Sequence, residues 1–323
     1  MVNIREQVAW VTDNKNKATE KGKSYIRAAV KRVTLHEALE KKEIDCNTDA
    51  LVIGAGPAGM EAAHMLAKAG RKVYLVEKNS FIGGRVARYE DVFPKMECAS
   101  CMLEPKMDEI LHDENIELLL NSEVQEVLGF LGNFVVRINK KAGFVDKEKC
   151  IGCGACYEQC PVKVKNEFDY NLSDRKAIYV PYTGALPNVP VIDKKTCLRF
   201  EGQNTGPQKE AFEAGLITRE EYERFKNQDC KRCKEACMFD AINYEDTDEI
   251  LERNVGGIIA ATGFELFDPS VLPQYGYGKI PEVYTSLEFE RILAQTGPTG
   301  GKLLMKNAKE PESVAIIHCI GSR

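Results

Sequence analysis

Cysteines are the residues of this 323-residue chain whose type and spacing most directly indicate chemistry, and the chain has 12 of them. Four form the run Cys150-x-x-Cys153-x-x-Cys156-x-x-x-Cys160-Pro161. Bacterial electron carriers bind [4Fe–4S] clusters with this spacing, and the fourth cysteine ligates the other cluster of a pair. Zinc sites instead combine CxxC pairs over long intervals. The run therefore predicts an iron–sulfur cluster.

A second cysteine set is less regular, because 32 residues, expected to form a helical hairpin over 198–229, separate its first two members. The segment VIDKKTC before its first cysteine echoes FVDKEKC before Cys150, which indicates the internal repeat of a two-cluster ferredoxin. We therefore predict one [4Fe–4S] cluster on Cys150, Cys153, Cys156 and Cys237, and a second on Cys160, Cys197, Cys230 and Cys233. A structural zinc ion on the second set is the alternative, because the long gap suits zinc.

A glycine-rich loop gives the second chemical signal. Gly54-Ala-Gly56-Pro-Ala-Gly59 follows the apolar segment ALVI and opens a predicted helix. The three glycines allow a tight turn, close approach of the backbone to a pyrophosphate, and packing of helix on strand, while the helix N-terminus attracts phosphate. A second predicted strand ends at Glu77, whose carboxylate can accept hydrogen bonds from a ribose. Together these features predict a dinucleotide-binding βαβ unit.

Two further segments favour FAD over NAD. Gly83-Gly84-Arg85 follows the second strand, and an Ala-Ala-Thr262-Gly263 segment ends a later strand. This arrangement resembles that of the two-dinucleotide-binding-domain flavoproteins, in which such segments close the FAD site. The chain has no second GxGxxG, which argues against a nicotinamide domain of its own. No Ser/His/Asp arrangement indicates acid–base catalysis, so the chemistry is expected to belong to cofactors.

Cys98 and Cys101 form a separate CxxC pair shortly after these glycines. A CxxC arrangement lowers thiol pKa, so the pair could be a redox dithiol near the flavin. It could equally ligate or flank a cluster, or be two buried structural cysteines, and spacing alone does not choose among these. We expect Cys46 to be structural and assign no role to Cys319.

The composition, with 44% hydrophobic and 29% charged residues, is that of a soluble globular protein and excludes disorder and coiled coil. The net charge is −5 and basic residues are scattered, so no nucleic-acid partner is expected. No apolar stretch approaches the roughly 20 residues that span a bilayer. The N-terminus lacks the features of a signal peptide, and we therefore expect a cytoplasmic protein.

Four segments are expected to position these residues. A helical arm over 1–47 precedes the FAD-binding domain, which comprises 48–143 and 247–323 and is interrupted by a ferredoxin-like domain over 144–246. The interruption is inferred because a buried-strand pattern returns in GGIIAATGF. The predicted class is α/β: a Rossmann-like FAD-binding domain with an inserted two-cluster ferredoxin-like module. The final VAIIHCIGSR has the pattern of another buried strand entering a glycine turn, from which we expect a truncated chain or a shortened relative of a longer protein.

The chain resembles the A subunits of the heterodisulfide reductase family along nearly its whole length. Matching stretches include REQVAW, ALVIGAGPAGMEAA, IGGRVAR, ECASCMLEPKM, the cluster run, RKAIYVPYTGALPNVPVID, ATGFELFDPS and CIGSR. The resemblance implies that FAD binds at Gly54, Gly56, Gly59, Glu77, Lys78, Gly83, Gly84, Arg85, Thr262 and Gly263. It also implies electron transfer between flavin and clusters, with disulfide cleavage on a partner subunit. In some complexes of the family the flavin splits an electron pair between two acceptors.

Three departures from the family pattern matter. Val8 stands where many relatives have a cysteine, and the first gap of the second cysteine set is expanded. Relatives also continue beyond CIGSR with further cysteines that, with the residue matching Cys319, bind another cluster.

We predict an FAD- and [4Fe–4S]-containing electron-transfer subunit that works with other heterodisulfide reductase-like subunits and with donor or acceptor proteins. A homodimer within a larger complex is one assembly compatible with this prediction. The alternatives are a self-contained FAD-dependent disulfide oxidoreductase that uses Cys98 and Cys101, the A subunit of a quinone-interacting complex, and a non-catalytic assembly module.

Overall fold

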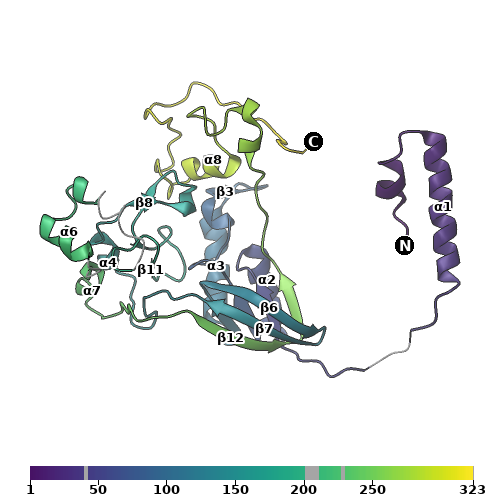
Figure 1. Ribbon diagram of the computed structural model, residues 1–323, viewed down its shortest axis with the longest axis horizontal. Coiled ribbons are helices and arrows are strands. Elements are labelled where there is room, and N and C mark those ends of the chain that lie inside the picture. Colours follow the sequence, from purple (N-terminus) through teal and green to yellow (C-terminus); the bar gives the residue numbers. More distant parts are fainter. Residues whose placement is uncertain (40–42, 201–210, 227–229, 323) are drawn as a thin grey trace. The chain divides into compact units, whose positions relative to one another are not determined.

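A computed structural model describes residues 1–39, 43–200, 211–226 and 230–322 of the chain (Figure 1). It divides into two units, Met1–Asp45 and Cys46–Arg323. The first unit contains the π-helix η1 (Arg5–Ala9) and the helix α1 (Lys15–Val33). The side chain of Asn14 caps α1 by accepting the N–H groups of residues 16 and 17. The helix expected in this arm is therefore present.

The second unit is built on a four-stranded parallel sheet in the order β13-β1-β2-β5. Its strands are β1 (Ala50–Ile53), β2 (Val73–Val76), β5 (Ile116–Leu119) and β13 (Gly257–Ala260). Two helices, α2 (Pro57–Lys68) and α3 (Ala99–His112), pack on one face through a core that includes Val52, Leu75 and Leu103. The predicted βαβ unit is confirmed.

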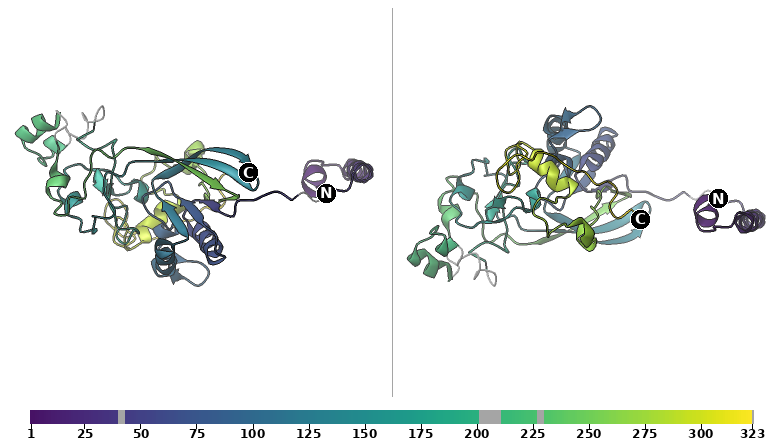
Figure 2. Two further views of the ribbon diagram at one scale, coloured as in Figure 1. Left: turned by 90° about the horizontal axis from the view of Figure 1, so that it is seen from below. Right: turned by 90° about the horizontal axis from the view of Figure 1, so that it is seen from above.

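An antiparallel sheet in the order β12-β7-β6 covers the other face. Its strands are β6 (Ser122–Phe130), β7 (Asn133–Lys140) and β12 (Glu249–Val255). Leu51 and Val76 of the parallel sheet pack with Val136, Ile138 and Val255 of this second sheet. Because neighbouring strand residues point to opposite faces, Leu51 and Val52 serve different cores. Figure 2 shows the antiparallel strands and the helices α2 and α3 on opposite sides.

The residues between β7 and β12 have a hydrophobic core of their own, which contains most of the clustered cysteines. Their elements are α4 (Ala155–Glu158), β8 (Val164–Lys165), η3 (Glu167–Asp169), β9 (Asp174–Arg175), β10 (Ile178–Tyr179), β11 (Val191–Ile192), α6 (Arg219–Lys226) and α7 (Arg232–Glu235). Of the hairpin expected over 198–229, α6 is present, whereas 201–210 and 227–229 lie outside the described residues.

The remaining elements are η2 (Val86–Arg88), β3 (Asp91–Val92), β4 (Glu97–Cys98), η4 (Pro269–Val271), η5 (Pro273–Tyr275) and α8 (Ser286–Leu293).

A buried arginine connects the cysteine-rich region to the last helix, α8. Arg291 of α8 is fully buried, and its Nε donates to Asp169 Oδ1 at 2.8 Å. Its Nη1 donates to the carbonyl of Arg88 at 2.9 Å, so one side chain joins three parts of the unit.

Two strand predictions near the C-terminal end need correction. β13 forms, but it is an edge strand that pairs with β1 alone, and Ile259 remains 39% exposed rather than buried. The prediction of a buried strand over 314–319 is wrong, because this segment forms no strand and Ile316 is 71% exposed. A strand needs a partner for its N–H and C=O groups, and the described residues place none beside this segment.

Candidate functional site

The glycine-rich loop turns sharply from β1 into α2. Gly54 has a φ of +101°, and a Cβ at this position would lie 2.4 Å from the carbonyl oxygen of Ala261. A Cβ at Gly59 would lie 1.8 Å from the carbonyl oxygen of Gly54. Only glycine fits at both positions, because any side chain would drive the helix or β13 away from the loop. The loop thus keeps its backbone N–H groups at the start of α2 within reach of a phosphate.

The three segments predicted to enclose FAD meet at the carboxyl end of β1. Gly84 has a φ of +60°, and a Cβ there would lie 2.8 Å from the Cα of Gly56. The N–H of Gly83 donates to the carbonyl of Ala55 at 2.8 Å. Ala261, which precedes Thr262, forms the wall against Gly54. This edge lies where the strand order reverses, which is where open parallel sheets bind ligands.

The predicted ribose-binding acid lies directly beside this loop. Glu77 is only 6% exposed, and its Oε2 accepts the N–H of Ala55 at 2.8 Å. Its Oε1 accepts the backbone N–H and the side-chain amide of Asn79, at 2.9 and 2.7 Å. These bonds hold the carboxylate at the tip of β2. The residues present therefore fit a dinucleotide whose pyrophosphate meets the glycines and whose ribose meets Glu77.

The remaining predicted FAD residues lie around the same edge. The guanidinium of Arg85 stacks over the ring of Phe264 at 4.2 Å from its centroid, next to Gly263. Thr262 and Gly263 are exposed at the end of β13, and Gly263 has a φ of +78°. Lys78 is exposed after Glu77.

Four of the predicted cluster cysteines line one small cavity, and they are Cys150, Cys153, Cys156 and Cys237. Apolar residues, including Phe239 and Ile242, complete its wall. Backbone N–H groups point at two of its sulfurs, because Gly152 donates to Cys150 Sγ and Ala241 donates to Cys237 Sγ, each at 3.4 Å. The cavity thus combines four thiols with an apolar wall and donors to sulfur.

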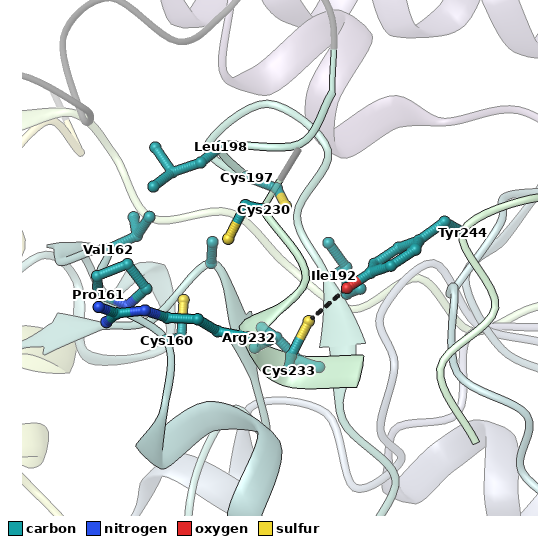
Figure 3. A pocket seen from close by; sticks show the side chains of 12 residues that line it. Cys160, Pro161, Val162, Ile192, Cys197, Leu198, Cys230, Arg232, Cys233 and Tyr244 are labelled. Atoms are coloured by element: carbon teal, nitrogen blue, oxygen red, sulfur yellow. Dashed lines mark hydrogen bonds between the residues drawn. The ribbon is translucent and has the colours of Figure 1, made fainter. Parts of the chain in front are cut away.

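The other four line a second small cavity, and they are Cys160, Cys197, Cys230 and Cys233 (Figure 3). All four are buried, and Tyr244 Oη lies 3.1 Å from Cys233 Sγ. Burial raises the pKa of the Cys197 thiol to about 12 and that of Cys230 to about 11. Such thiols keep their protons at neutral pH unless iron favours the thiolate.

The two halves of this cysteine-rich region share a local fold. The N–H of Cys150 donates to the carbonyl of Asp146, and the N–H of Cys197 donates to the carbonyl of Asp193, both at 3.0 Å. The echo between FVDKEKC and VIDKKTC therefore corresponds to the same turn before each cysteine. A [4Fe–4S] cluster carries its thiolates on four irons of a cube, so ligands around a cavity are the arrangement that it requires. Within the described ranges, no group of three or more His, Cys, Asp or Glu is placed to hold a single metal ion.

Cys98 and Cys101 lie apart from both cavities. Cys98 is the N-cap of α3, and its Sγ accepts the N–H of Cys101 at 3.5 Å. The N–H and thiol of Cys101, with a smaller contribution from the N–H of Ser100, lower the pKa of Cys98. The shared hydrogen bond and the charge of Cys98 raise the pKa of Cys101. Because both are exposed, the interpretation as buried structural cysteines is wrong.

Two other cysteines also lie outside both cavities. Cys46 is exposed and donates to the carbonyl of Asn47 at 3.2 Å, and Cys319 is exposed with a φ of +58°. Tyr244, in contrast, is absent from the sequence-based prediction although it contacts a cluster cysteine. The internal repeat gives no signal for it, because the residue at the equivalent position of the first half is Val180.

The fold and these sites define a flavoprotein-type Rossmann domain that carries a 4Fe–4S module. Family models agree: residues 52–104 match "NAD(P)-binding Rossmann-like domain" and residues 144–165 match "4Fe-4S binding domain".

Curated relatives name the particular family. The chain is 40% identical over 323 residues to the A subunit of H(2):CoB-CoM heterodisulfide,ferredoxin reductase of Methanothermobacter marburgensis, covering 99% of this chain and 44% of that protein. It is 43% identical over 325 residues to an iron–sulfur A subunit of CoB–CoM heterodisulfide reductase of Methanopyrus kandleri, covering 100% of this chain and 44% of that protein. The chain belongs to the family of heterodisulfide reductase A subunits, as its sequence predicts, and spans less than half the length of these relatives. In the part of the chain that the structure describes, no helix has the length and apolar character needed to cross a bilayer.

Proposed function

We propose that the chain is the flavin- and iron–sulfur-binding electron-transfer part of a heterodisulfide reductase-like complex. The observation that carries this proposal is the division of eight cysteines between two cavities, in the same unit as the glycine-lined dinucleotide edge. When bound, FAD would exchange electrons in pairs and each cluster would exchange them singly. A chain with both groups can therefore convert between the two kinds of transfer.

The chain's own residues bind and insulate these groups. The loop from Gly54 to Gly59 holds the pyrophosphate, and Glu77 orients the ribose. The cysteines of the two cavities ligate iron, and apolar neighbours such as Ile242 and Leu198 keep water away from the sulfurs.

The partners proposed are those that the names of the relatives indicate. These names describe the A subunits of enzymes that act on the CoB-CoM heterodisulfide and ferredoxin. We infer that this chain joins the other subunits of such a complex in the cytoplasm, as one copy or as a homodimer, and that a partner subunit cleaves the disulfide.

The first test is the content of FAD, iron and acid-labile sulfide per chain after anaerobic purification. Two clusters predict about 8 iron, about 8 sulfide and about one FAD. About 4 iron together with zinc would show that the second cysteine set is a structural zinc site, and absence of FAD would refute the flavin site.

Double substitutions then test which cysteines share a cluster. Cys160 and Cys197 line the same cavity, so the double variant Cys160→Ala with Cys197→Ala is expected to lose one cluster and to retain about 4 iron. Cys153→Ala with Cys197→Ala affects both cavities and is expected to lose nearly all iron. Cys46→Ala, which lies outside both cavities, is the control and keeps about 8 iron. Loss of all iron from the first double variant would contradict the assignment of Cys160.

A second candidate function rests on the exposed Cys98 and Cys101 at the start of α3. In a self-contained disulfide oxidoreductase, the Cys98 thiolate would attack a substrate disulfide, and Cys101 would resolve the mixed disulfide to leave an oxidised pair that the reduced flavin reduces again. Rapid bleaching of bound FAD by NADPH in the isolated chain, with disulfide turnover lost in Cys98→Ser, would support this candidate. No bleaching by NADPH is expected for the electron-transfer function.

A further inference from the structure

Tyr244 forms part of the wall of the second cysteine cavity, and its hydroxyl points at Cys233 Sγ from 3.1 Å (Figure 3). Its ring is held by the two residues that follow Leu198. The guanidinium of Arg199 lies 4.2 Å from the ring centroid, and the ring of Phe200 packs edge-on at 6.5 Å. Both contacts restrain the ring, so the direction of the hydroxyl is fixed by packing.

The first cavity has a different set of donors to sulfur. Backbone N–H groups of Gly152 and Ala241 reach Cys150 and Cys237, each at 3.4 Å. Within the described residues, no side-chain hydroxyl is bonded to a sulfur of this cavity. Sulfurs of the first cavity thus accept backbone N–H groups, whereas the second cavity has a side-chain hydroxyl at the Cys233 sulfur.

The internal repeat places no equivalent hydroxyl in the first half of the cysteine-rich region. Ala241 and Ala177 are equivalent, because each carbonyl accepts the N–H of the aspartate before a cluster cysteine, at 2.8 and 2.7 Å. Tyr244 follows Ala241 by three positions, and the residue at the same interval after Ala177 is Val180. The side chain of valine cannot donate a hydrogen bond. The two halves of the repeat therefore differ at this position, with a hydroxyl at Tyr244 and none at Val180.

We propose that the Tyr244 hydroxyl donates a hydrogen bond to the Cys233 sulfur when a cluster is bound, and that this bond makes the second cavity's cluster easier to reduce than it would be without the hydroxyl. The inference rests on the proposed two-cluster function. A cluster gains one negative charge on reduction, and a donor at a ligand sulfur stabilises the more negative state. The hydroxyl would thereby favour the transfer of an electron to the second cavity.

A redox titration followed by electron paramagnetic resonance under anaerobic conditions tests this inference. Tyr244→Phe keeps the ring between Arg199 and Phe200 and removes the hydroxyl alone. We expect one of the two midpoint potentials to fall, while the other potential and the iron content stay as in the unaltered chain. Titration of Cys160→Ala, which retains the first cavity's cluster, identifies which potential belongs to which cavity.

Tyr157→Phe is the matched control. Tyr157 packs on the same core beside Cys156, but among the described residues its hydroxyl is not bonded to a cysteine sulfur. Both potentials are expected to remain unchanged in this variant. A fall in potential in both tyrosine variants would assign the effect to general polarity of the module and overturn the role of Tyr244.

Two further variants distinguish the effect of the Tyr244 hydroxyl on the potential from the effect of its ring packing. Tyr244→Leu removes ring and hydroxyl together, and is expected to lower the same potential as Tyr244→Phe. Replacing Tyr244 by 3-fluorotyrosine keeps the ring and makes the hydroxyl a stronger donor, so the potential is expected to rise. This analogue keeps the test valid even if Tyr244→Phe fails to bind its cluster.

The outcomes distinguish this inference from the function on which it rests. About 4 iron in the unaltered chain would refute the second cluster itself. About 8 iron with potentials that neither Tyr244→Phe nor 3-fluorotyrosine changes would refute the role of Tyr244 and leave the two-cluster proposal intact.

Discussion

Gly84→Ala is the substitution that most directly tests the dinucleotide edge. The added Cβ would lie 2.8 Å from the Cα of Gly56, whereas carbon atoms in contact are normally separated by about 3.5–4.0 Å. The new methyl group must therefore push the segment after β2 away from the glycine-rich loop. The distance between the glycine-rich loop and the segment after β2, which form two sides of the FAD site, would increase, so FAD affinity is expected to fall.

Comparison with Gly70→Ala gives the expected size of the loss in FAD affinity. Gly84 has a φ of +60° and Gly70 has a φ of +73°, so alanine at either position adopts a left-handed conformation that costs about 1–2 kcal/mol. At Gly70, however, an added Cβ meets nothing within 4 Å. The difference between the variants is therefore the clash, which costs about 1–3 kcal/mol. Expressed in FAD binding, this range corresponds to a Kd about 5- to 150-fold higher.

The Kd for FAD is measured by quenching of flavin fluorescence during anaerobic titration of flavin-free protein. Gly84→Ala is expected to bind FAD more weakly than Gly70→Ala and to lose more thermal stability, because both variants carry backbone strain and only Gly84→Ala adds the clash. Equal FAD affinity in the two variants would refute the placement of the pyrophosphate between the two glycine segments.

Two further predictions concern a buried ion pair and the exposed thiols. Arg291→Ala leaves the buried Asp169 carboxylate without its partner and is expected to lower the free energy of unfolding by about 3–5 kcal/mol, whereas Arg137→Ala at an exposed pair changes it by less than about 1 kcal/mol. Urea denaturation measures both, and a small loss for Arg291→Ala would contradict its role as the link between three segments. Because the pKa of Cys98 is lowered and that of Cys101 raised, the rate of alkylation by iodoacetamide should begin to rise at a lower pH for Cys98. Single Cys→Ser variants separate the two rates, and the opposite order would contradict the helix-cap geometry.

Much of the dinucleotide edge follows from sequence because its determinants are local. Gly54, Gly56 and Gly59 have roles set by turn geometry and by packing of adjacent elements, and Glu77 ends the next strand. The two cysteine groups were also predictable, because the echo before Cys150 and Cys197 implies equivalent folds. The structure groups these cysteines as the echo predicts, and ligation itself stays a prediction.

Other features depend on contacts that no local pattern encodes. The contact of Tyr244 with Cys233 depends on the tertiary fold of the cysteine-rich region, and the ion pair of Arg291 and Asp169 joins residues 122 positions apart. The strand pattern over 314–319 shows the limit of periodicity, because apolar character indicates that a segment can be a strand but does not supply its partner. The same limit explains why β13 was expected to be buried.

The pairing of β7 with β12 has a consequence for how the protein is assembled. Lys140 lies opposite Glu249, so the chain leaves and re-enters the antiparallel sheet at a single point. The long insertion between β7 and β12 adds little to the entropic cost of pairing these strands compared with a shorter connection, because loop-closure entropy grows slowly with length. The long insertion is therefore compatible with a closed antiparallel sheet. The cysteine-rich region is thus inserted at one point of the chain, and tertiary contacts such as Arg291 with Asp169 and the N–H of Ile82 with the carbonyl of Leu186 then hold it against the flavin-binding layers.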